Sequence, residues 1–319
     1  MIVRNDIRLV TGNANRGLAQ RIAAYLGTEL TDCSVKRFSD GEIFVQINEN
    51  VRGADLFIIQ PTNPPAENLM ELLMLIEASR RASAMRITAV IPYYGYARQD
   101  RKDKPRVPIT AKLVANLITS VGADRVMTMD LHASQIQGFF DLPHDHLYSS
   151  NLFNSYFRNL KVDNLVVVSP DVGSLKMARS TAEALNADLA IVDKRRPEPN
   201  ESKVMSLIGE VKGKHILIRD DMVDTGGSLV QAAEYLKARG ALDIYAACTH
   251  GVLSGNAVER LSKSPIIRTI ISDSIDQQSK NLPADFEVIT CSKLIGEAIR
   301  RTFDEESISS LFAEPNNRV

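Results

Sequence analysis

The sequence predicts an α/β protein in which mainly parallel sheets are flanked by helices. Short apolar runs rich in Val and Ile alternate with amphipathic stretches of helical spacing, an order typical of βαβ units. The run from Leu165 to Ser169 is almost wholly apolar, as expected of a strand buried on both faces of a sheet. The chain has 319 residues, enough for two domains, and the rhythm of strand and helix occurs twice. We place the two domains at residues 1–147 and 148–319, and leave open that the last residues pack back on the first domain.

The individual elements follow from the same signals. Strands are predicted at residues 7–10, 56–60, 87–91, 125–130, 165–169, 189–193, 215–219 and 243–248. Helices are predicted at residues 18–26, 68–82, 109–122, 174–187 and 229–240. Gly27 and Gly122 suit helix ends because glycine readily takes positive φ, and Pro108 is expected in the first turn of its helix. Since parallel sheets bind ligands at the carboxyl ends of their strands, functional residues are expected directly after the apolar runs.

Composition and charge exclude several classes of protein. Lys and Arg number 38 against 39 Asp and Glu, and a net charge of −1 does not favour a nucleic-acid partner. No apolar stretch approaches the roughly 18 residues that span a bilayer, so no membrane partner is expected. The three cysteines, Cys33, Cys248 and Cys291, form no CxxC pair, which argues against disulfides or zinc and indicates a reducing compartment. We therefore expect a cytoplasmic enzyme.

The strongest functional signal follows the apolar run at residues 215–219. Two adjacent carboxylates, Asp220 and Asp221, precede a turn from which a helix begins. The turn consists of Asp224, Thr225, Gly226, Gly227 and Ser228. Consecutive N–H groups at such a helix start bind an anion, so the turn predicts a phosphate cradle, while the two carboxylates suit sugar hydroxyls or Mg²⁺. The alternative is a helix cap after an ordinary turn, but the acidic pair directly upstream favours a functional site.

This block resembles the fingerprint that binds 5-phosphoribosyl 1-pyrophosphate (PRPP) in phosphoribosyltransferases and PRPP synthetases. Four further segments, and the C-terminal stretch, resemble the phosphate-regulated class I family of ribose-phosphate pyrophosphokinases. They are RFSDGEIFVQINENVRG (37–53), YGYARQDRKDK (94–104), MDLHASQIQGFFD (129–141), VDKRRPEPN (192–200) and EAIRRTFDEESISSLF (297–312). The resemblance implies two phosphoribosyltransferase-like domains, an N-terminal one on the ATP side and a C-terminal one that binds ribose 5-phosphate. It also implies transfer of the pyrophosphoryl group of Mg-ATP to the anomeric hydroxyl of ribose 5-phosphate, giving PRPP and AMP for nucleotide biosynthesis.

The resemblance also assigns residues to ATP. The assigned residues are Phe38, Asp40, Glu42, Arg98, Gln99 and Asp103. Their chemistry is suitable, because Phe38 can stack on a base, Arg98 can pair with a phosphate and Gln99 can read an adenine edge. Without the resemblance, Phe38 would be taken as a core residue and residues 98–104 as a solvated charged run.

Cations and a metal ion complete the implied site. By resemblance, His132 and Asp171 bind Mg²⁺ with ATP, and His132, Lys194 and Arg196 are catalytic, the last two on a mobile loop over the transferring group. A lone histidine is more often structural, and a basic turn is more often only solvated surface. Imidazole is an unusual ligand for Mg²⁺, so direct and water-mediated contacts both stay open. No general base stands out, and activation of the hydroxyl by Mg²⁺ and by an aspartate remain equal alternatives.

Regulation and assembly are also implied by the resemblance. The family is activated by phosphate, inhibited by ADP and forms homo-oligomers, expected to be hexamers, in which a neighbouring subunit contributes to the adenine site. Candidate regulatory residues are Arg52, Gln137, Ser307 and Ser309. Two other functions stay open: a phosphoribosyltransferase that consumes PRPP, and a non-catalytic regulatory relative of the synthetase. The two-part chain argues against the first, and the presence of all the site residues argues against the second.

Overall fold

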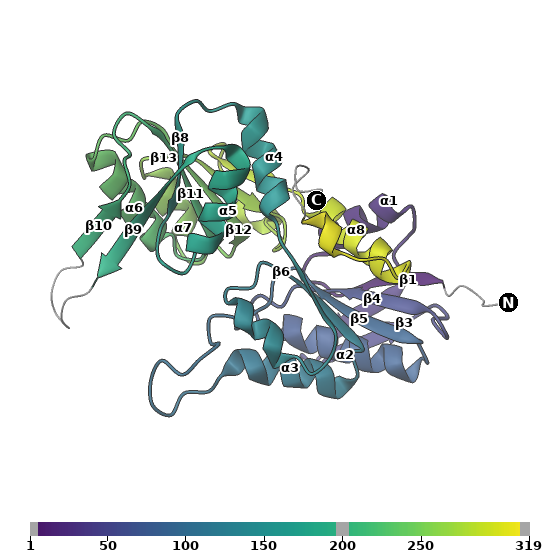
Figure 1. The fold of residues 1–319 in the computed structure, drawn as a ribbon. Helices are drawn as coiled ribbons and strands as arrows, with labels where there is room; N and C mark the ends of the chain where they lie inside the picture. Colours follow the sequence, from purple (N-terminus) through teal and green to yellow (C-terminus); the bar gives the residue numbers. More distant parts are fainter. Residues whose placement is uncertain (1–5, 196–203, 313–319) are drawn as a thin grey trace. The chain divides into compact units, whose positions relative to one another are not determined.

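A computed structural model describes residues 6–195 and 204–312, and their contacts divide into two compact units. Unit 1 contains residues 6–148, 274–276 and 290–312. Unit 2 contains residues 149–195, 204–273 and 277–289. Each unit has its own sheet, flanked by helices (Figure 1).

Unit 1 is built on a parallel sheet of five strands in the order β1-β4-β5-β6-β7. The strands are β1 (Ile7–Thr11), β4 (Asp55–Ile59), β5 (Arg86–Ile91), β6 (Arg125–Met129) and β7 (His144–Leu147). The helices are α1 (Arg16–Leu26), α2 (Glu67–Arg81), α3 (Thr110–Val121) and α8 (Ser292–Phe303), with short 3₁₀ helices η1 (Ser134–Phe139) and η3 (Ser309–Leu311). A separate antiparallel hairpin is formed by β2 (Cys33–Arg37) and β3 (Ile43–Ile47). Helices α2 and α3 cover one face of the five-stranded sheet, and α1 and α8 cover the other (Figure 1).

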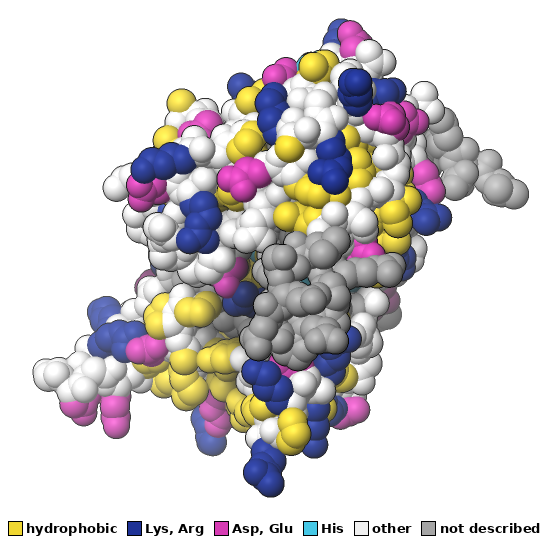
Figure 2. Space-filling view, turned by 90° about the vertical axis from the view of Figure 1, so that its left-hand side faces the viewer, with side chains coloured by type: hydrophobic (Ala, Val, Ile, Leu, Met, Phe, Trp, Pro, Cys, Tyr) yellow, Lys and Arg dark blue, Asp and Glu magenta, His cyan; other side chains and the backbone are white. Residues whose placement is uncertain are grey.

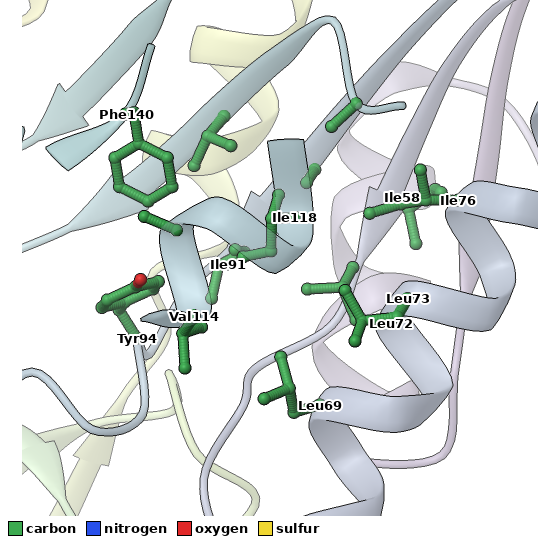
Figure 3. Close-up of a cluster of buried hydrophobic side chains, with 14 of the residues drawn as sticks. Ile58, Leu69, Leu72, Leu73, Ile76, Ile91, Tyr94, Val114, Ile118 and Phe140 are labelled. Atoms are coloured by element: carbon green, nitrogen blue, oxygen red, sulfur yellow. The ribbon is translucent and has the colours of Figure 1, made fainter. Parts of the chain in front are cut away.

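The core of unit 1 lies between its sheet and helices α2 and α3 (Figure 3). The apolar residues of α2 recur three and four positions apart, which places Leu69, Leu72, Leu73 and Ile76 on one buried face. They meet Ile58 of β4 and the other apolar side chains of the sheet. Each fully buried aliphatic side chain contributes about 1.5–3 kcal/mol, so this face is sufficient to hold α2 against the sheet.

Helix α8 packs in unit 1 although it lies near the end of the sequence. The hydroxyl of Tyr25 in α1 donates a hydrogen bond to Glu297 in α8 at 3.0 Å. A Cβ atom on Gly296 would lie 2.5 Å from the Tyr25 ring, so glycine is what allows the two helices to approach. Arg300 and Arg301 donate hydrogen bonds to Glu297 and, with Tyr25, lower the pKa of that carboxyl to about 2. Residues from the two ends of the sequence therefore share one helical layer.

Unit 2 contains a sheet of seven strands in the order β10-β9-β8-β11-β12-β13-β14. All neighbouring pairs are parallel except β9 with β10. The strands are β8 (Leu165–Ser169), β9 (Asp188–Arg195), β10 (Val204–Ile208), β11 (His215–Val223), β12 (Ile244–Gly251), β13 (Ile266–Ser272) and β14 (Phe286–Ile289). The helices are α4 (Ser150–Leu160), α5 (Leu175–Leu185), α6 (Gly227–Ala238) and α7 (Ala257–Ser262), with a short η2 (Gln278–Lys280). Two hydrophobic clusters, one containing residues of α4 and α5 and the other residues of α6 and α7, pack on the sheet.

The predicted α/β fold with helix-flanked, mainly parallel sheets is confirmed, and three local expectations need correction. Helix α3 begins at Thr110 after a non-helical Ile109, so Pro108 precedes the helix and does not lie in its first turn. Strand β11 continues to Val223, so Asp220 and Asp221 belong to the strand. Strand β9 runs on through Lys194 and pairs with β10, an antiparallel neighbour that the sequence did not predict. In the part of the chain that is described, no helix is long and apolar enough to cross a membrane.

Candidate functional site

The order of strands in unit 2 reverses between β8 and β11. The chain passes from β8 to β9 on one side, and then returns to place β11 on the other side of β8. In open α/β sheets, ligands bind at such a reversal, outside the carboxyl ends of the strands. The segment after β8 carries Asp171, and the end of β11 carries Asp220 and Asp221. The topology therefore places these carboxylates at the edge where a ligand is expected.

Ser174 connects the two carboxylate-bearing segments. Its hydroxyl donates a hydrogen bond to Oδ1 of Asp220 and lies 3.4 Å from Oδ1 of Asp171. Its backbone N–H also donates to Oδ1 of Asp171 at 3.1 Å. The backbone N–H of Asp221 donates to the same Oδ1 of Asp220 at 2.9 Å. Asp171 and Asp220 are therefore held in relation to each other by one buried serine.

The electrostatics of this site favour a ligand that brings positive charge or hydrogen-bond donors. Burial is the main cause that raises the pKa of Asp220 well above its usual value, and the charges of Asp221 and Asp171 raise it further. The hydrogen bond from Ser174 opposes this shift only in part. Crowded carboxylates of this kind are relieved by a cation or by hydroxyl donors. Sugar hydroxyls and a divalent cation are both suited to this requirement.

The cradle lies between the end of β11 and the start of α6. Gly226 precedes the helix with φ +73°, a conformation that glycine adopts without the usual steric cost. The carbonyl of Thr225 accepts a hydrogen bond from Nη1 of Arg260 in α7 at 2.7 Å, which anchors the turn from outside. The first N–H groups of a helix have no acceptor within the helix, so the start of α6 offers donors for an anion. Arg260 was not singled out from the sequence, because its position beside the turn depends on how α7 packs.

In unit 1, the predicted ATP residues at the ends of β5 and β6 belong to two connected segments. Arg98, Gln99 and Asp103 follow β5 and are exposed, and His132 follows β6 and is exposed. Nε2 of Gln135 donates to Oδ2 of Asp100 at 2.7 Å, which ties the segment after β6 to the segment after β5.

Other contacts hold the two segments in place. Oε1 of Gln99 accepts from Oγ1 of Thr110 at 2.5 Å, and the backbone N–H of Leu131 donates to Nε2 of His146 at 3.1 Å. The second contact fixes the backbone immediately before His132.

The remaining predicted ATP residues occupy the tip of the β2–β3 hairpin in unit 1. Phe38 is 56% exposed, with its ring centroid 5.4 Å from that of Phe44, so it is not a core residue of this unit. Oδ1 of Asp40 accepts a hydrogen bond from the backbone N–H of Glu42 at 3.0 Å, and Gly41 takes φ +98° to close the turn. The tip thus presents an aromatic face next to two carboxylates.

The structure describes fewer contacts for the predicted catalytic cations and the regulatory candidates. Lys194 lies on β9 with its backbone paired to Met205, whereas Arg196 lies outside the described residues. The regulatory candidates Arg52, Gln137, Ser307 and Ser309 all belong to unit 1. The amide of Gln137 donates to the carbonyl of Ser134 at 3.1 Å, and the hydroxyl of Ser307 accepts from the backbone N–H of Ser309 at 3.2 Å.

The donor chemistry fits a magnesium ion that arrives with a phosphate ligand. Among residues 6–195 and 204–312 no group of three or more His, Cys, Asp or Glu side chains could hold a metal ion by itself. Mg²⁺ is commonly held by only one or two carboxylates, with substrate phosphates and waters completing its coordination. The carboxylates of Asp171, Asp220 and Asp221 supply oxygen ligands of the required type.

The fold and this site together define a class: a two-unit, mainly parallel α/β protein with an acidic pair and a Gly-rich turn before a helix at the carboxyl edge of one sheet. The visible face in Figure 2 shows Lys and Arg side chains interspersed with Asp and Glu, in keeping with the net charge of −1. Comparison with known proteins specifies the class further.

Residues 7–122 match the N-terminal domain of ribose phosphate pyrophosphokinase, and residues 194–313 match the phosphoribosyl synthetase-associated domain. The chain is 58% identical over 315 residues to a ribose-phosphate pyrophosphokinase of Chlorobaculum tepidum, covering 98% of this chain and 97% of the relative. It is 55% identical to one of Thermosipho africanus, covering 98% of this chain and 99% of that relative. A crystal structure of phosphoribosylpyrophosphate synthetase from Mycobacterium smegmatis matches with a TM-score of 0.89 and 39% identity, covering 94% of this chain and 100% of that one.

The chain belongs to the ribose-phosphate pyrophosphokinase family and is an enzyme of that family. The resemblance inferred from the sequence is confirmed, and so is the α/β fold class of two phosphoribosyltransferase-like domains.

Proposed function

We propose that this enzyme transfers the pyrophosphoryl group of ATP to the anomeric hydroxyl of ribose 5-phosphate, giving PRPP and AMP. The observation that carries the proposal is the acidic pair Asp220–Asp221 on the last part of β11, with a Gly-rich turn at the start of α6 close behind it. One part suits the hydroxyls of a sugar, and the other suits its phosphate. The names of the relatives support the same reaction.

Unit 2 supplies the residues proposed for ribose 5-phosphate. The turn from Asp224 to Ser228 binds the 5-phosphate through backbone N–H groups and the hydroxyls of Thr225 and Ser228. Asp220 and Asp221 accept hydrogen bonds from the ribose hydroxyls, and the contact from Ser174 holds Asp220 in one orientation. Such positioning is the main requirement of a transfer reaction that needs little covalent chemistry from the protein.

Residues proposed for ATP come from the hairpin tip and from the segments after β5 and β6. Phe38 stacks on the adenine, Asp40 and Glu42 accept from its amine or the ribose, and Arg98, Gln99 and Asp103 contact the rest of the nucleotide. Mg²⁺ is the proposed cofactor, and when bound it neutralises phosphate charge. Asp171 is its proposed carboxylate ligand, and His132 contributes directly or through water. Lys194 and Arg196 stabilise the charge that develops on the transferring group.

The decisive experiment separates this function from its two alternatives. The purified enzyme is incubated with Mg²⁺, ATP and ribose 5-phosphate, and AMP and PRPP are measured in parallel. Equal amounts of both products support the proposal. Consumption of PRPP that depends on a nucleobase would instead identify a phosphoribosyltransferase, and nucleotide binding without turnover would identify a regulatory relative.

The proposal extends to assembly, regulation and compartment. We infer a homo-oligomer, a hexamer by family resemblance, with phosphate and ADP as effectors acting through Arg52, Gln137, Ser307 and Ser309. The exposed aromatic tip at Phe38 supports a role for the hairpin in a site completed by a neighbouring subunit. A cytoplasmic location is supported by free cysteines at Cys33, Cys248 and Cys291.

A mixing experiment tests the shared site. Phe38→Ala and Asp224→Ala variants, each nearly inactive, are dissociated and reassembled together. A site completed by a neighbouring subunit predicts partial recovery of activity, because some sites then receive both intact halves. No recovery, despite proven mixing of subunits, would show that each site lies within one chain.

A further inference from the structure

Strand β11 carries a charged side chain that the proposed mechanism does not use. Arg219 is 0% exposed and is the largest fully buried side chain among the described residues. Because side chains alternate across a strand, Arg219 shares its face with Leu217, which packs with Phe153 of α4, and Ile218 points to the opposite core. The guanidinium carbon lies 4.2 Å from the ring centroid of Phe153. The arginine therefore occupies a position at which the strand pattern calls for an apolar residue.

The guanidinium binds oxygen atoms from three different elements. Nη1 donates to the backbone carbonyl of Asp220 at 2.5 Å and to that of Ala247 in β12 at 3.2 Å. Nη2 donates to the hydroxyl of Ser149, just before α4, at 3.0 Å and to that of Thr249 in β12 at 3.1 Å. The hydroxyls of Ser149 and Thr249 are also within 2.9 Å of each other. One planar group thus links β11, β12 and the start of α4 around the carbonyl of Asp220.

These contacts lie beside an irregularity in the sheet. The ladder between β11 and β12 keeps one register from Ile216 opposite Ile244 to Val223 opposite Gly251. On its other side, β12 has a register shift against β13 between Cys248 and His250. The irregularity lies at Thr249, beside Asp221. Arg219 donates hydrogen bonds to Ala247 and Thr249, on the β12 segment that contains this irregularity.

A charge in this position is costly for stability alone. Removing a guanidinium from water costs free energy, and replacing buried charged groups by apolar side chains of similar size is often neutral or stabilising. An apolar residue would also continue the face formed by Leu217 and Phe153. Stability therefore does not explain why an arginine occupies this position, whereas a role in the geometry of the site does.

We propose that Arg219 is a positioning residue for ribose 5-phosphate: its guanidinium holds the carbonyl of Asp220 against β12 and the start of α4, and so fixes the direction of the Asp220 and Asp221 carboxylates. This inference rests on the proposed role of the two aspartates. Arg219 acts through the backbone and does not touch the substrate.

The test removes the planar guanidinium of Arg219 and keeps a side chain of similar size. Arg219→Met retains the packing on Phe153 and removes the donors, and Arg219→Lys keeps the charge without the fork. Small displacements of groups that bind a substrate weaken its binding. Arg219→Met is therefore expected to raise KM for ribose 5-phosphate by about tenfold, with KM for ATP unchanged. Arg219→Lys should give a smaller increase. Ribose 5-phosphate binding to the full-length enzyme, measured by calorimetry, should weaken in parallel.

Ile218→Val is the matched control, because it alters the neighbouring buried residue on the opposite face of the same strand. It should lower the melting temperature modestly and leave both KM values at the wild-type level. A folded Arg219→Met variant with wild-type affinity for ribose 5-phosphate would overturn the inference.

If Arg219→Met does not fold, Thr249→Val replaces it as the test, because this variant removes the hydroxyl that accepts a hydrogen bond from Arg219. An unchanged affinity of Thr249→Val for ribose 5-phosphate would also overturn the inference. Lack of ribose 5-phosphate binding by the wild type would instead overturn the proposed function, and the inference with it.

Discussion

The two units present their candidate residues in different ways. In unit 1, Phe38 is at the tip of a hairpin, and Arg98 and His132 are in exposed segments after strands. In unit 2, Asp220 and Asp221 belong to a central strand and are partly buried, with Asp220 tied to Ser174. Groups on rigid strands are held more accurately than groups on loops. On the proposed assignment of substrates, unit 2 would hold ribose 5-phosphate in a preformed site, whereas unit 1 is suited to residues that adjust when the nucleotide binds.

The units also differ in the polar groups that they bury. Unit 1 places His144 on its edge strand β7, where the ring stacks on Phe140 with centroids 4.9 Å apart. Unit 2 places Asp220 and Arg219 on the central strand β11, with neighbours on both sides. Burial keeps the His144 side chain away from the candidate residues of unit 1, whereas Asp220 and Arg219 lie at the candidate site of unit 2.

The largest effect is expected at Lys194, on strand β9, the neighbour of β8 in the sheet of unit 2. Lys194→Ala should lower kcat by about 10²–10³-fold, with smaller changes in both KM values, because its charge acts mainly in the transition state. Steady-state kinetics at saturating Mg²⁺ provide the measurement. The neighbouring Arg195→Ala is the matched control and should retain most of the activity. Unchanged kcat with a higher KM would show that Lys194 only binds substrate.

The second effect is the response of unit 1 to acid. Burial, with a smaller contribution from His146, lowers the pKa of His144 from 6.5 to about 4. The unfolded state therefore binds more protons between these values, so stability is present above pH 6.5 and is lost as the pH falls toward 4.

Between pH 6.5 and pH 4 the free energy of unfolding of the wild type should fall by about 2–3 kcal/mol more than that of His144→Gln, because glutamine does not bind a proton in this range. Urea unfolding at the two ends of the pH range tests it. Equal losses in the wild type and the variant would assign the acid sensitivity to other groups.

The smallest effect compares a glycine from each unit. Gly226→Ala should cost about 1–2 kcal/mol of stability because of its positive φ, and its Cβ would lie 3.2 Å from Leu261. Gly41→Ala has the same conformational strain, but nothing lies within 4 Å of its Cβ. Gly226→Ala should therefore raise KM for ribose 5-phosphate, and Gly41→Ala should raise KM for ATP. The assignment of substrates to units would be wrong if the two variants showed the reverse pattern.

Local sequence signals predicted the central strands of unit 2 and helices α5 and α6, but not β10, β13, β14, α4 or α7. The turn between β11 and α6 was found because strand, Gly-rich turn and helix start are consecutive in the chain; that it binds an anion stays a prediction. The helix end at Gly27 was predicted for the same reason, since the conformation of glycine is a local property, and the structure shows φ +66° there. Arg219 was not singled out from the sequence, because its partners lie on other elements of the fold.

The sequence by itself determined the alternation of strands and helices, the acidic pair and the Gly-rich turn before α6, because each depends on residues close together in the chain. Only the tertiary structure decided which distant groups meet. Ser174 reaches Asp220 because β8 and β11 are neighbours, and Arg219 reaches Ser149 and Thr249 because α4 and β12 pack beside β11. Such contacts join residues tens of positions apart, and their geometry follows from the order of strands in the sheet and from the packing of helices on it, which no local pattern specifies.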